Sequence, residues 1–176
     1  MKKQKKIAAK EPFILEYGKQ YRFDELDKKL IRALDEDARA SFAELAKKVG
    51  LSRDAIRNRI QKLIDNQVIA KFKPIFNPPR MGFPTINYVF ISLYNPSAEK
   101  EEEFVRFLRQ QKHITYVASL IGKWDYIIDV MAENPGHFDS LLKALRQKFP
   151  DLIKDYEIYG VLREYKYEEI GALVYS

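Results

Sequence analysis

The sequence predicts an α+β protein in which an N-terminal winged helix-turn-helix precedes a C-terminal ferredoxin-like β-α-β-β-α-β domain. Two observations support this prediction. Apolar residues recur with helical spacing in three segments within residues 24–64, and β-prone and helical segments alternate from residue 86 onward. Residues 77–82 separate the two patterns, because two prolines and a glycine within six residues cannot continue a helix or a central strand.

Each of the three expected helices begins after a good N-cap. Asp24 precedes the first, Ser41 precedes the second with Glu44 three residues later as a capping box, and Ser52 precedes the third. Gly50 is a natural end for the second helix, so the turn to the third is very short. The apolar faces consist of Leu26, Leu30, Ile31 and Leu34, then Phe42, Leu45, Ala46 and Val49, then Ile56, Ile60, Leu63 and Ile64.

The remaining segments complete the domain plan. Two short β-prone runs, residues 68–72 and 74–76, predict a small hairpin that would form the wing. The second half predicts strands at 86–94, 114–121, 126–131 and 153–167, with helices at 97–111 and 135–149. The expected organisation is a basic and aromatic extension, a winged helix-turn-helix domain, a hinge, a ferredoxin-like domain and a tail, at residues 1–23, 24–76, 77–85, 86–167 and 168–176.

Both faces of the predicted sheet are apolar. The first expected strand has Ile86, Tyr88 and Phe90 on one side and Val89 and Ile91 on the other. A sheet with helices on one face only should be polar on its second face, and exposed apolar patches above roughly several hundred Å² are uncommon in monomers. An identical sheet from a second chain is the most economical cover, and the apolar stretch 13–23 is the alternative.

The composition excludes several classes of protein. With 46% hydrophobic residues, the chain can bury a core that a disordered chain could not. The absence of cysteine excludes disulfide scaffolds, thiolate nucleophiles and Cys-ligated metals, and two histidines leave little for a histidine metal cage. No apolar run approaches the roughly 20 residues that span a bilayer, and the lysine-rich start lacks the apolar segment of a signal peptide. We therefore expect a cytoplasmic protein with no cofactor and no membrane partner.

Charge is distributed unevenly along the chain. Residues 1–79 carry a net charge of +8 and residues 80–176 carry −2, within a total of +6. A basic half joined to a slightly acidic half favours polyanion binding by the N-terminal half. The lysine run at Lys2, Lys3, Lys5 and Lys6 is expected to add phosphate contacts that do not depend on base sequence.

The third expected helix offers a polar face to a partner. Its apolar stripe at Ile56, Ile60 and Leu63 leaves the opposite side polar. Arginine, asparagine and glutamine make bidentate contacts with base edges in the major groove, so this face predicts the reading of double-stranded DNA rather than only a solvated surface. The residues expected to contact DNA are Ser41, Ser52, Arg53, Asp54, Arg57, Asn58, Gln61 and Lys71.

Several runs of this sequence resemble one known family. Residues 26–31, 42–46, 49–52, 59–63 and 68–69 are similar to the DNA-binding domain of the Lrp/AsnC (feast/famine) transcription regulators. The linker between Asn77 and Gly82 resembles that family's hinge. The β-α-β-β-α-β half, with its Gly122, Asp125 and Tyr126, resembles its effector-binding and assembly domain. The resemblance covers about residues 24–167.

The resemblance implies a regulator that dimerises through its C-terminal sheets, often assembles into octamers, and takes amino acids as effectors. Two features depart from the family pattern. The extension before Asp24 is longer than usual, and residues 165–176 run past the usual last strand, which leaves the assembly state open. The candidate effector-binding residues are Leu120, Gly122, Lys123, Asp125 and Tyr126.

Two alternative functions would use the same architecture. A siroheme-decarboxylase-like enzyme would need histidine and arginine groups around a tetrapyrrole, whereas His113 and His137 occupy positions that are more often surface or capping sites. Asp125 and Asp129 have no base or metal partner in the sequence pattern, and no glycine-rich phosphate loop is present, so we expect no enzyme and no catalytic residues. The other alternative is an amino-acid-sensing assembly protein without DNA binding, which the basic N-terminal half disfavours.

Overall fold

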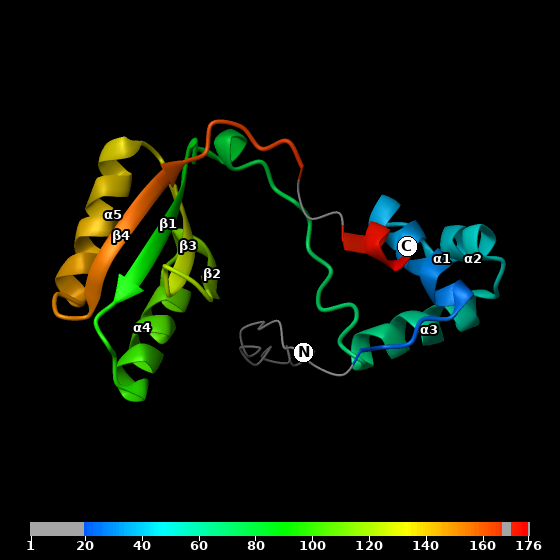
Figure 1. The fold of residues 1–176 in the computed structure, drawn as a ribbon. Helices are drawn as coiled ribbons and strands as arrows, with labels where there is room; N and C mark the ends of the chain where they lie inside the picture. The colour runs from blue at the N-terminus through cyan, green and yellow to red at the C-terminus, as the bar shows by residue number, and fades with distance from the viewer. Residues whose placement is uncertain (1–19, 167–169, 176) are drawn as a thin grey trace, which may run out of the picture. The chain divides into compact units, whose positions relative to one another are not determined.

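The computed structural model describes residues 20–166 and 170–175, so the lysine run near the N-terminus lies outside the described residues. The described chain divides into two compact units (Figure 1). The first contains residues 20–74 together with residues 166 and 170–175, and the second contains residues 75–165. The break expected at residues 77–82 therefore lies at the start of the second unit.

Three α-helices build the first unit: α1 (Glu25–Glu36), α2 (Phe42–Val49) and α3 (Arg53–Asp65) (Figure 1). Side-chain caps fix their starts. Asp24 and Ser41 each form a capping box, and the Ser52 hydroxyl accepts a hydrogen bond from the Ala55 N–H. α2 ends at Gly50, whose φ of 80° lies in the left-handed region that glycine adopts without the steric cost of a Cβ. The three helices and their caps confirm the prediction.

The core of the first unit takes one face from each helix. All of its buried apolar side chains except Ala33 come from the positions that the helical spacing identified, and burying each leucine, isoleucine or valine contributes roughly 1.5–3 kcal/mol. They are Leu30, Ala33, Leu45, Val49, Ile56, Ile60 and Leu63. Packing of this shared core holds α3 against α1 and α2, and so fixes the direction of its outer face.

The wing expected at residues 68–72 and 74–76 does not form in the described structure. These residues adopt no regular secondary structure, and Phe72, Ile75 and Phe76 are 47%, 70% and 60% exposed. The physical reason is local. A single residue between the two runs is too short for a two-residue hairpin turn, and Pro74 has no N–H to donate to a ladder.

A short C-terminal helix completes the first unit. The 3₁₀-helix η2 (Ile170–Tyr175) packs against α1. Gly171 lies close to Asp35 of α1, because a Cβ at this position would lie 2.5 Å from Cγ of Asp35. The absence of a side chain at residue 171 therefore permits the contact between η2 and α1.

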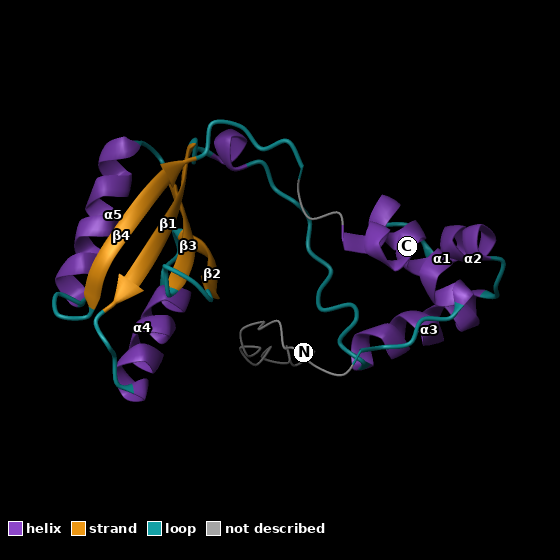
Figure 2. Cartoon of the chain, viewed as in Figure 1, coloured by secondary structure: helices purple, strands orange, loops and turns teal. Residues whose placement is uncertain are grey.

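The second unit is the expected β-α-β-β-α-β domain, with β1 (Thr85–Leu93), β2 (Ile114–Ser119), β3 (Tyr126–Ala132) and β4 (Ile153–Gly160). The antiparallel sheet has the strand order β2-β3-β1-β4. Helices α4 (Ala98–Gln110) and α5 (Pro135–Lys148) contribute to a core on one face of the sheet (Figure 2). The order of elements confirms the ferredoxin-like prediction. A 3₁₀-helix, η1 (Pro78–Met81), precedes β1.

Two strands are shorter than expected. β4 ends at Gly160 rather than at residue 167. It pairs only with β1, and Gly160 already lies opposite Asn87, two residues from the start of β1. One further backbone hydrogen bond joins the Val161 N–H to the Ile86 carbonyl, after which β1 has almost no residues left to pair. β2 ends at Ser119, before the loop to β3.

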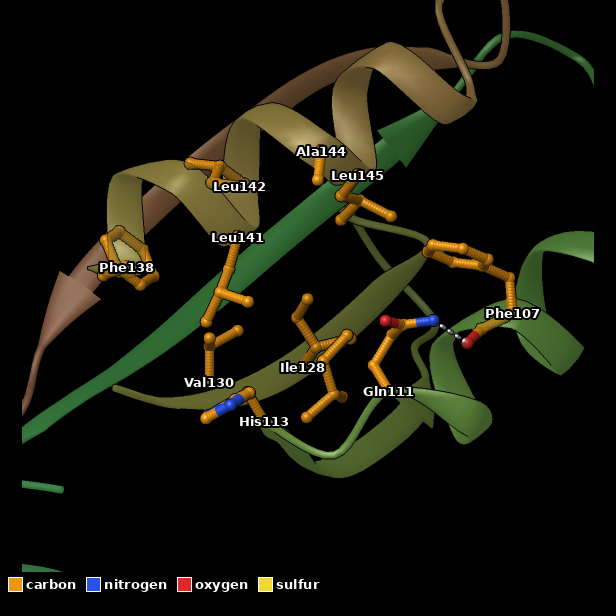
Figure 3. A pocket seen from close by; sticks show the side chains of 11 residues that line it. Phe107, Gln111, His113, Ile128, Val130, Phe138, Leu141, Leu142, Ala144 and Leu145 are labelled. Atoms are coloured by element: carbon orange, nitrogen blue, oxygen red, sulfur yellow. Dashed lines mark hydrogen bonds between the residues drawn. The ribbon is translucent and has the colours of Figure 1, made fainter. Parts of the chain in front are cut away.

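A small cavity lies between the sheet and the two helices (Figure 3). Its walls are mainly apolar side chains of α4, α5, β2 and β3. At its polar side, the Gln111 side chain donates a hydrogen bond of 3.2 Å to the Phe107 carbonyl. The volume is about 60 Å³, less than half of the ~150 Å³ apolar cavity that binds benzene in a protein core. The cavity is therefore a packing gap and too small for an amino acid.

Candidate nucleic-acid interface

The outer face of α3 carries the residues expected to read DNA. Ile56, Ile60 and Leu63 are buried against α1 and α2, so the opposite side of the helix faces solvent. The side chains exposed on that side are Arg53, Asp54, Arg57, Asn58 and Gln61. The tight turn between α2 and α3 and this exposed polar face form the arrangement in which a recognition helix enters the major groove.

Contacts among these side chains are weak enough to be exchanged. Arg57 lies 3.5 Å from Asp54 and its guanidinium stands 5.5 Å from the centroid of the Phe42 ring, while Gln61 donates a 2.7 Å hydrogen bond to Asp65. Exposed ion pairs of this kind are worth about 0–1 kcal/mol. Base edges and phosphates can therefore replace the present partners at low cost, while Phe42 on α2 limits the orientations of Arg57.

The remaining candidates lie around the same helix pair. Ser41 and Ser52 are exposed at the N-termini of α2 and α3, where each hydroxyl oxygen accepts a backbone hydrogen bond and its O–H is left to donate to a phosphate. Lys71 is exposed in the segment that follows α3. The structure thus gathers all eight candidates in the first unit, seven of them on α3 or at the caps.

A buried carboxylate that the sequence reasoning missed anchors α3. Asp27 is 1% exposed, and Arg59 on α3 approaches it to 2.6 Å and also reaches Asp24 at 2.8 Å. The pKa of Asp24 is lowered mainly by the hydrogen bond from the Asp27 N–H, and further by Arg59. Tyr21 donates a further hydrogen bond of 3.3 Å to Asp27.

A signal for this anchor was present in the sequence. Asp27 shares the helical face of Leu30, Ile31 and Leu34, and a carboxylate on an apolar face needs a cationic partner. The partner, Arg59, lies 32 positions away in the sequence. The pair fixes how far and at what angle α3 stands from the N-terminus of α1.

The loop between β2 and β3 holds most of the candidate effector residues. The Leu120 N–H donates to the Asp125 carbonyl at 2.8 Å, and Gly122 between them has a φ of 148°. The Asp125 carboxylate accepts a hydrogen bond of 2.7 Å from the Leu93 N–H, which ties the loop to the end of β1. One carboxylate oxygen of Asp125 is thus already engaged.

Tyr126 differs from the other effector candidates because its side chain lies in the core. It is 5% exposed, packs edge-to-face on Phe104, and donates its hydroxyl hydrogen to Glu101 of α4. Burial, and then the hydrogen bond to Glu101, raise the pKa of this phenol. The structure therefore brings Leu120, Gly122, Lys123 and Asp125 together at the loop and places the Tyr126 ring under α4.

Comparison with known proteins identifies the family. The profile of the AsnC-type helix-turn-helix domain matches residues 23–64, and that of the Lrp/AsnC ligand binding domain matches residues 87–170. The chain belongs to the Lrp/AsnC family. It is a helix-turn-helix transcriptional regulator that binds DNA, and not an enzyme, as the sequence predicted.

The similarity to other transcriptional regulators extends over most of the chain. The transcriptional regulator Ptr1 of Methanocaldococcus jannaschii is 30% identical over 146 residues, which cover 81% of this chain and 94% of Ptr1. A crystal structure of an AsnC family regulator from Agrobacterium tumefaciens superposes with a TM-score of 0.75 at 28% identity, covering 82% of this chain and 94% of that one. A Neisseria meningitidis regulator crystallised with L-Met shares the fold at 20% identity, with a TM-score of 0.75 over 83% of this chain and 94% of that chain.

The two histidines of this Lrp/AsnC protein lie side by side. Their ring centroids are 4.6 Å apart, and His113 makes a 2.9 Å hydrogen bond with the Met131 carbonyl. Within residues 20–166 and 170–175, no cluster of three or more histidine, aspartate or glutamate side chains could hold a metal ion. In the same part of the chain, every helix is too short or too polar to span a bilayer.

Proposed function

We propose that this Lrp/AsnC regulator acts in the cytoplasm as a homodimer that binds a two-fold symmetric DNA site. Each subunit would place α3 in the major groove, with Arg53, Arg57, Asn58 and Gln61 toward base edges and Ser41, Ser52 and Lys71 toward phosphates. The exposed polar face of α3, opposite its buried apolar stripe, is the observation that supports this assignment. Asp54 lies on the same face, where a carboxylate can accept from cytosine amino groups.

We further propose that an amino acid modulates DNA binding from the ligand-binding domain. The loop residues Leu120, Gly122, Lys123 and Asp125 are the proposed contacts, and Tyr126 supports the loop from beneath α4. The proposal is supported by the match to the Lrp/AsnC ligand binding domain and by the L-Met found in the Neisseria relative. Assembly of dimers into octamers is the expected higher state.

The proposed dimer interface is the face of the sheet opposite α4 and α5. Val89, Ile91, Ile128 and Val130 belong to the core on the helix side, so their neighbours along each strand point to the other side. Those neighbours are largely apolar and half-buried: Tyr88, Phe90, Ile127 and Met131. An identical sheet from a second subunit would cover this face and make an isologous contact.

Selection of bound fragments from genomic DNA tests the DNA-binding proposal. We expect the enriched fragments to share an inverted repeat whose half-sites are about one helical turn, or multiples of it, apart. The selection is then repeated in the presence of each common amino acid in turn. We expect the amount of DNA recovered to change only with the amino acid that acts as the effector. An enriched motif without two-fold symmetry would contradict binding by a symmetric dimer.

Sedimentation of the full chain tests the dimer interface. We expect dimers or larger multiples for the native protein and monomers for Met131→Glu, because pairing the sheets would bury two unpaired carboxylates at a cost of several kcal/mol. Met81→Glu is the matched control, since Met81 is 56% exposed in η1. A Met131→Glu protein that stays dimeric would assign the interface to another surface.

A further inference from the structure

An aromatic side chain on α2 lies outside the core of the first unit. Phe42 is the first residue of α2 and shares the apolar face of that helix with Leu45 and Val49. Leu45 and Val49 are buried in the core, whereas Phe42 is 40% exposed and does not belong to it. A ring left in water gains little from the hydrophobic effect. Packing of the unit therefore does not account for an aromatic residue at this position.

The capping box of α2 holds Phe42 in place. The Ser41 N–H donates to the Glu44 carboxylate at 2.7 Å, and the Glu44 N–H donates to the Ser41 hydroxyl at 3.3 Å. Phe42 lies between these two residues, so both hydrogen bonds fix its backbone. The ring therefore projects from a fixed point at the start of α2.

The Phe42 ring lies near one residue on the outer face of α3. The guanidinium carbon of Arg57 stands 5.5 Å from the ring centroid, within the roughly 6 Å over which a cation is attracted to the π electrons. One Arg57 nitrogen also lies 3.5 Å from a carboxylate oxygen of Asp54. Arg57 thus contacts a ring on α2 and a carboxylate on its own helix.

These two contacts differ in what they leave for DNA. A carboxylate attracts the N–H groups of the guanidinium, and these are the groups that bind the O6 and N7 atoms of guanine. A ring attracts the cation without needing those N–H groups in hydrogen bonds. Arg57 can therefore exchange Asp54 for a base and stay over the Phe42 ring. Because the ring already restricts a long, flexible side chain, less rotamer freedom is lost when the base binds.

We propose that Phe42 is a positioning residue for base reading. Its ring holds the Arg57 guanidinium in the direction of the major groove before DNA binds, and stays in contact with it while Arg57 binds a guanine. The inference rests on the proposed DNA-binding role of α3 and adds a specificity determinant on α2. Tyrosine at position 42 would serve equally well, whereas leucine is apolar but has no π electrons.

Guanines that lack N7 identify the base that Arg57 binds. In the DNA site obtained by genomic selection, 7-deazaguanine replaces each guanine of a half-site in turn, which removes one acceptor of the bidentate contact. Replacing the guanine bound by Arg57 should weaken binding of the native full chain and leave binding of Arg57→Ala unchanged. Fluorescence anisotropy measures each affinity, and a random duplex supplies the nonspecific reference.

The variant Phe42→Leu keeps an apolar side chain and removes the ring. We expect it to lower affinity for the selected site by about two- to fivefold per half-site, the range of an exposed cation–π contact. Affinity for the random duplex should not change, and the effect of 7-deazaguanine should shrink. Phe42→Tyr retains a ring and should bind as the native protein does. Adding Phe42→Leu to Arg57→Ala should cost nothing further, since the ring acts through Arg57.

Two controls separate positioning from a general structural role. Thermal unfolding of Phe42→Leu should match that of the native protein, because Phe42 lies outside the core. The matched control for loss of a ring near a cation is Tyr156→Leu, since the Tyr156 ring centroid lies 5.3 Å from the Arg146 guanidinium in the second unit. Tyr156→Leu should bind both duplexes as the native protein does.

The outcomes distinguish this inference from the proposed function. If Phe42→Leu binds the selected site as the native protein does while Arg57→Ala binds it more weakly, the role of Phe42 is wrong and the DNA-binding function stands. A loss from Phe42→Leu that is equally large in the Arg57→Ala background also overturns the role, because the ring would then act without Arg57. If Arg57→Ala itself keeps native affinity, the base-reading assignment of Arg57 fails, and the role of Phe42 with it.

Discussion

Alanine at Arg57 or at Asn58 is expected to weaken binding to the specific DNA site by about 1–3 kcal/mol, roughly 5- to 150-fold, because each side chain would lose a bidentate base contact. Both residues are exposed on the outer face of α3, and the present contacts of Arg57, with Asp54 and the Phe42 ring, lie at the surface. Fluorescence anisotropy with the selected site and with random duplex, at one fixed salt concentration, measures the change.

The comparison between the two duplexes decides whether these residues read bases. A base-reading residue lowers affinity for the specific site more than for random DNA, whereas a phosphate contact lowers both alike. Arg106→Ala is the matched control, because Arg106 forms a similarly exposed helical ion pair with Glu102 on α4. Equal losses on both duplexes would contradict the assignment of Arg57 and Asn58.

Replacing Arg59 by methionine is expected to lower the free energy of unfolding of the first unit by about 3 kcal/mol. The change leaves Asp27 buried without its cation, and removing one partner of a buried pair costs roughly 3–5 kcal/mol. Arg59 itself is 23% exposed, which places the expected cost at the low end. Calorimetric unfolding measures it, and DNA affinity should fall with it because α3 loses its anchor.

Two variants distinguish an unpaired buried charge from a simple loss of packing. Arg32→Met removes an exposed pair with Glu36 on α1 and should change stability by less than about 1 kcal/mol. The double variant with Asp27→Leu and Arg59→Met removes both charges, and should recover much of the stability that Arg59→Met loses. A double variant less stable than Arg59→Met would show that the pair itself, rather than the orphaned carboxylate, matters.

Lowering the pH tests the contacts of Asp24 with Arg59 and with the Asp27 N–H. The pKa of Asp24 is lowered in the folded state by the Asp27 N–H and by Arg59. A carboxyl whose pKa falls on folding stabilises the protein above its unfolded-state pKa, and that contribution disappears as the pH drops through the folded-state value. The stability of the native protein should therefore decline in acid below the ordinary aspartate range.

Features fixed by neighbours in the sequence were predictable. The caps at Ser41 and Ser52 and the end at Gly50 depend on residues within four positions, so the three helices and the exposed side of α3 followed from spacing. The order of strands and helices in the second unit was predictable for the same reason. The wing was a wrong prediction because β-propensity was weighed without the turn. Only Lys73 separates the two β-prone runs, and Pro74 has no N–H to donate to a ladder.

Features that join distant segments were not predictable from one sequence. The approach of Arg59 to Asp27, and of Lys123 to Glu157, links residues 32 and 34 positions apart. The side of the sheet on which Tyr126 lies depends on strand register, since a shift by one residue would turn its ring to the other face. The family resemblance placed Tyr126 among the effector candidates beside the loop, whereas the structure buries its side chain beneath α4.

The packing of η2 on α1 has a consequence for biosynthesis. Translation delivers α1, α2 and α3 first, then the whole ligand-binding domain, and residues 170–175 last. During that interval the nascent helix-turn-helix carries an uncovered surface around Asp35, where Gly171 will later sit. Domains generally fold as they leave the ribosome, N-terminal first, but this one completes its contacts only when the ribosome has passed residue 175. Truncated translation products would therefore carry a helix-turn-helix that still lacks one of its packed segments.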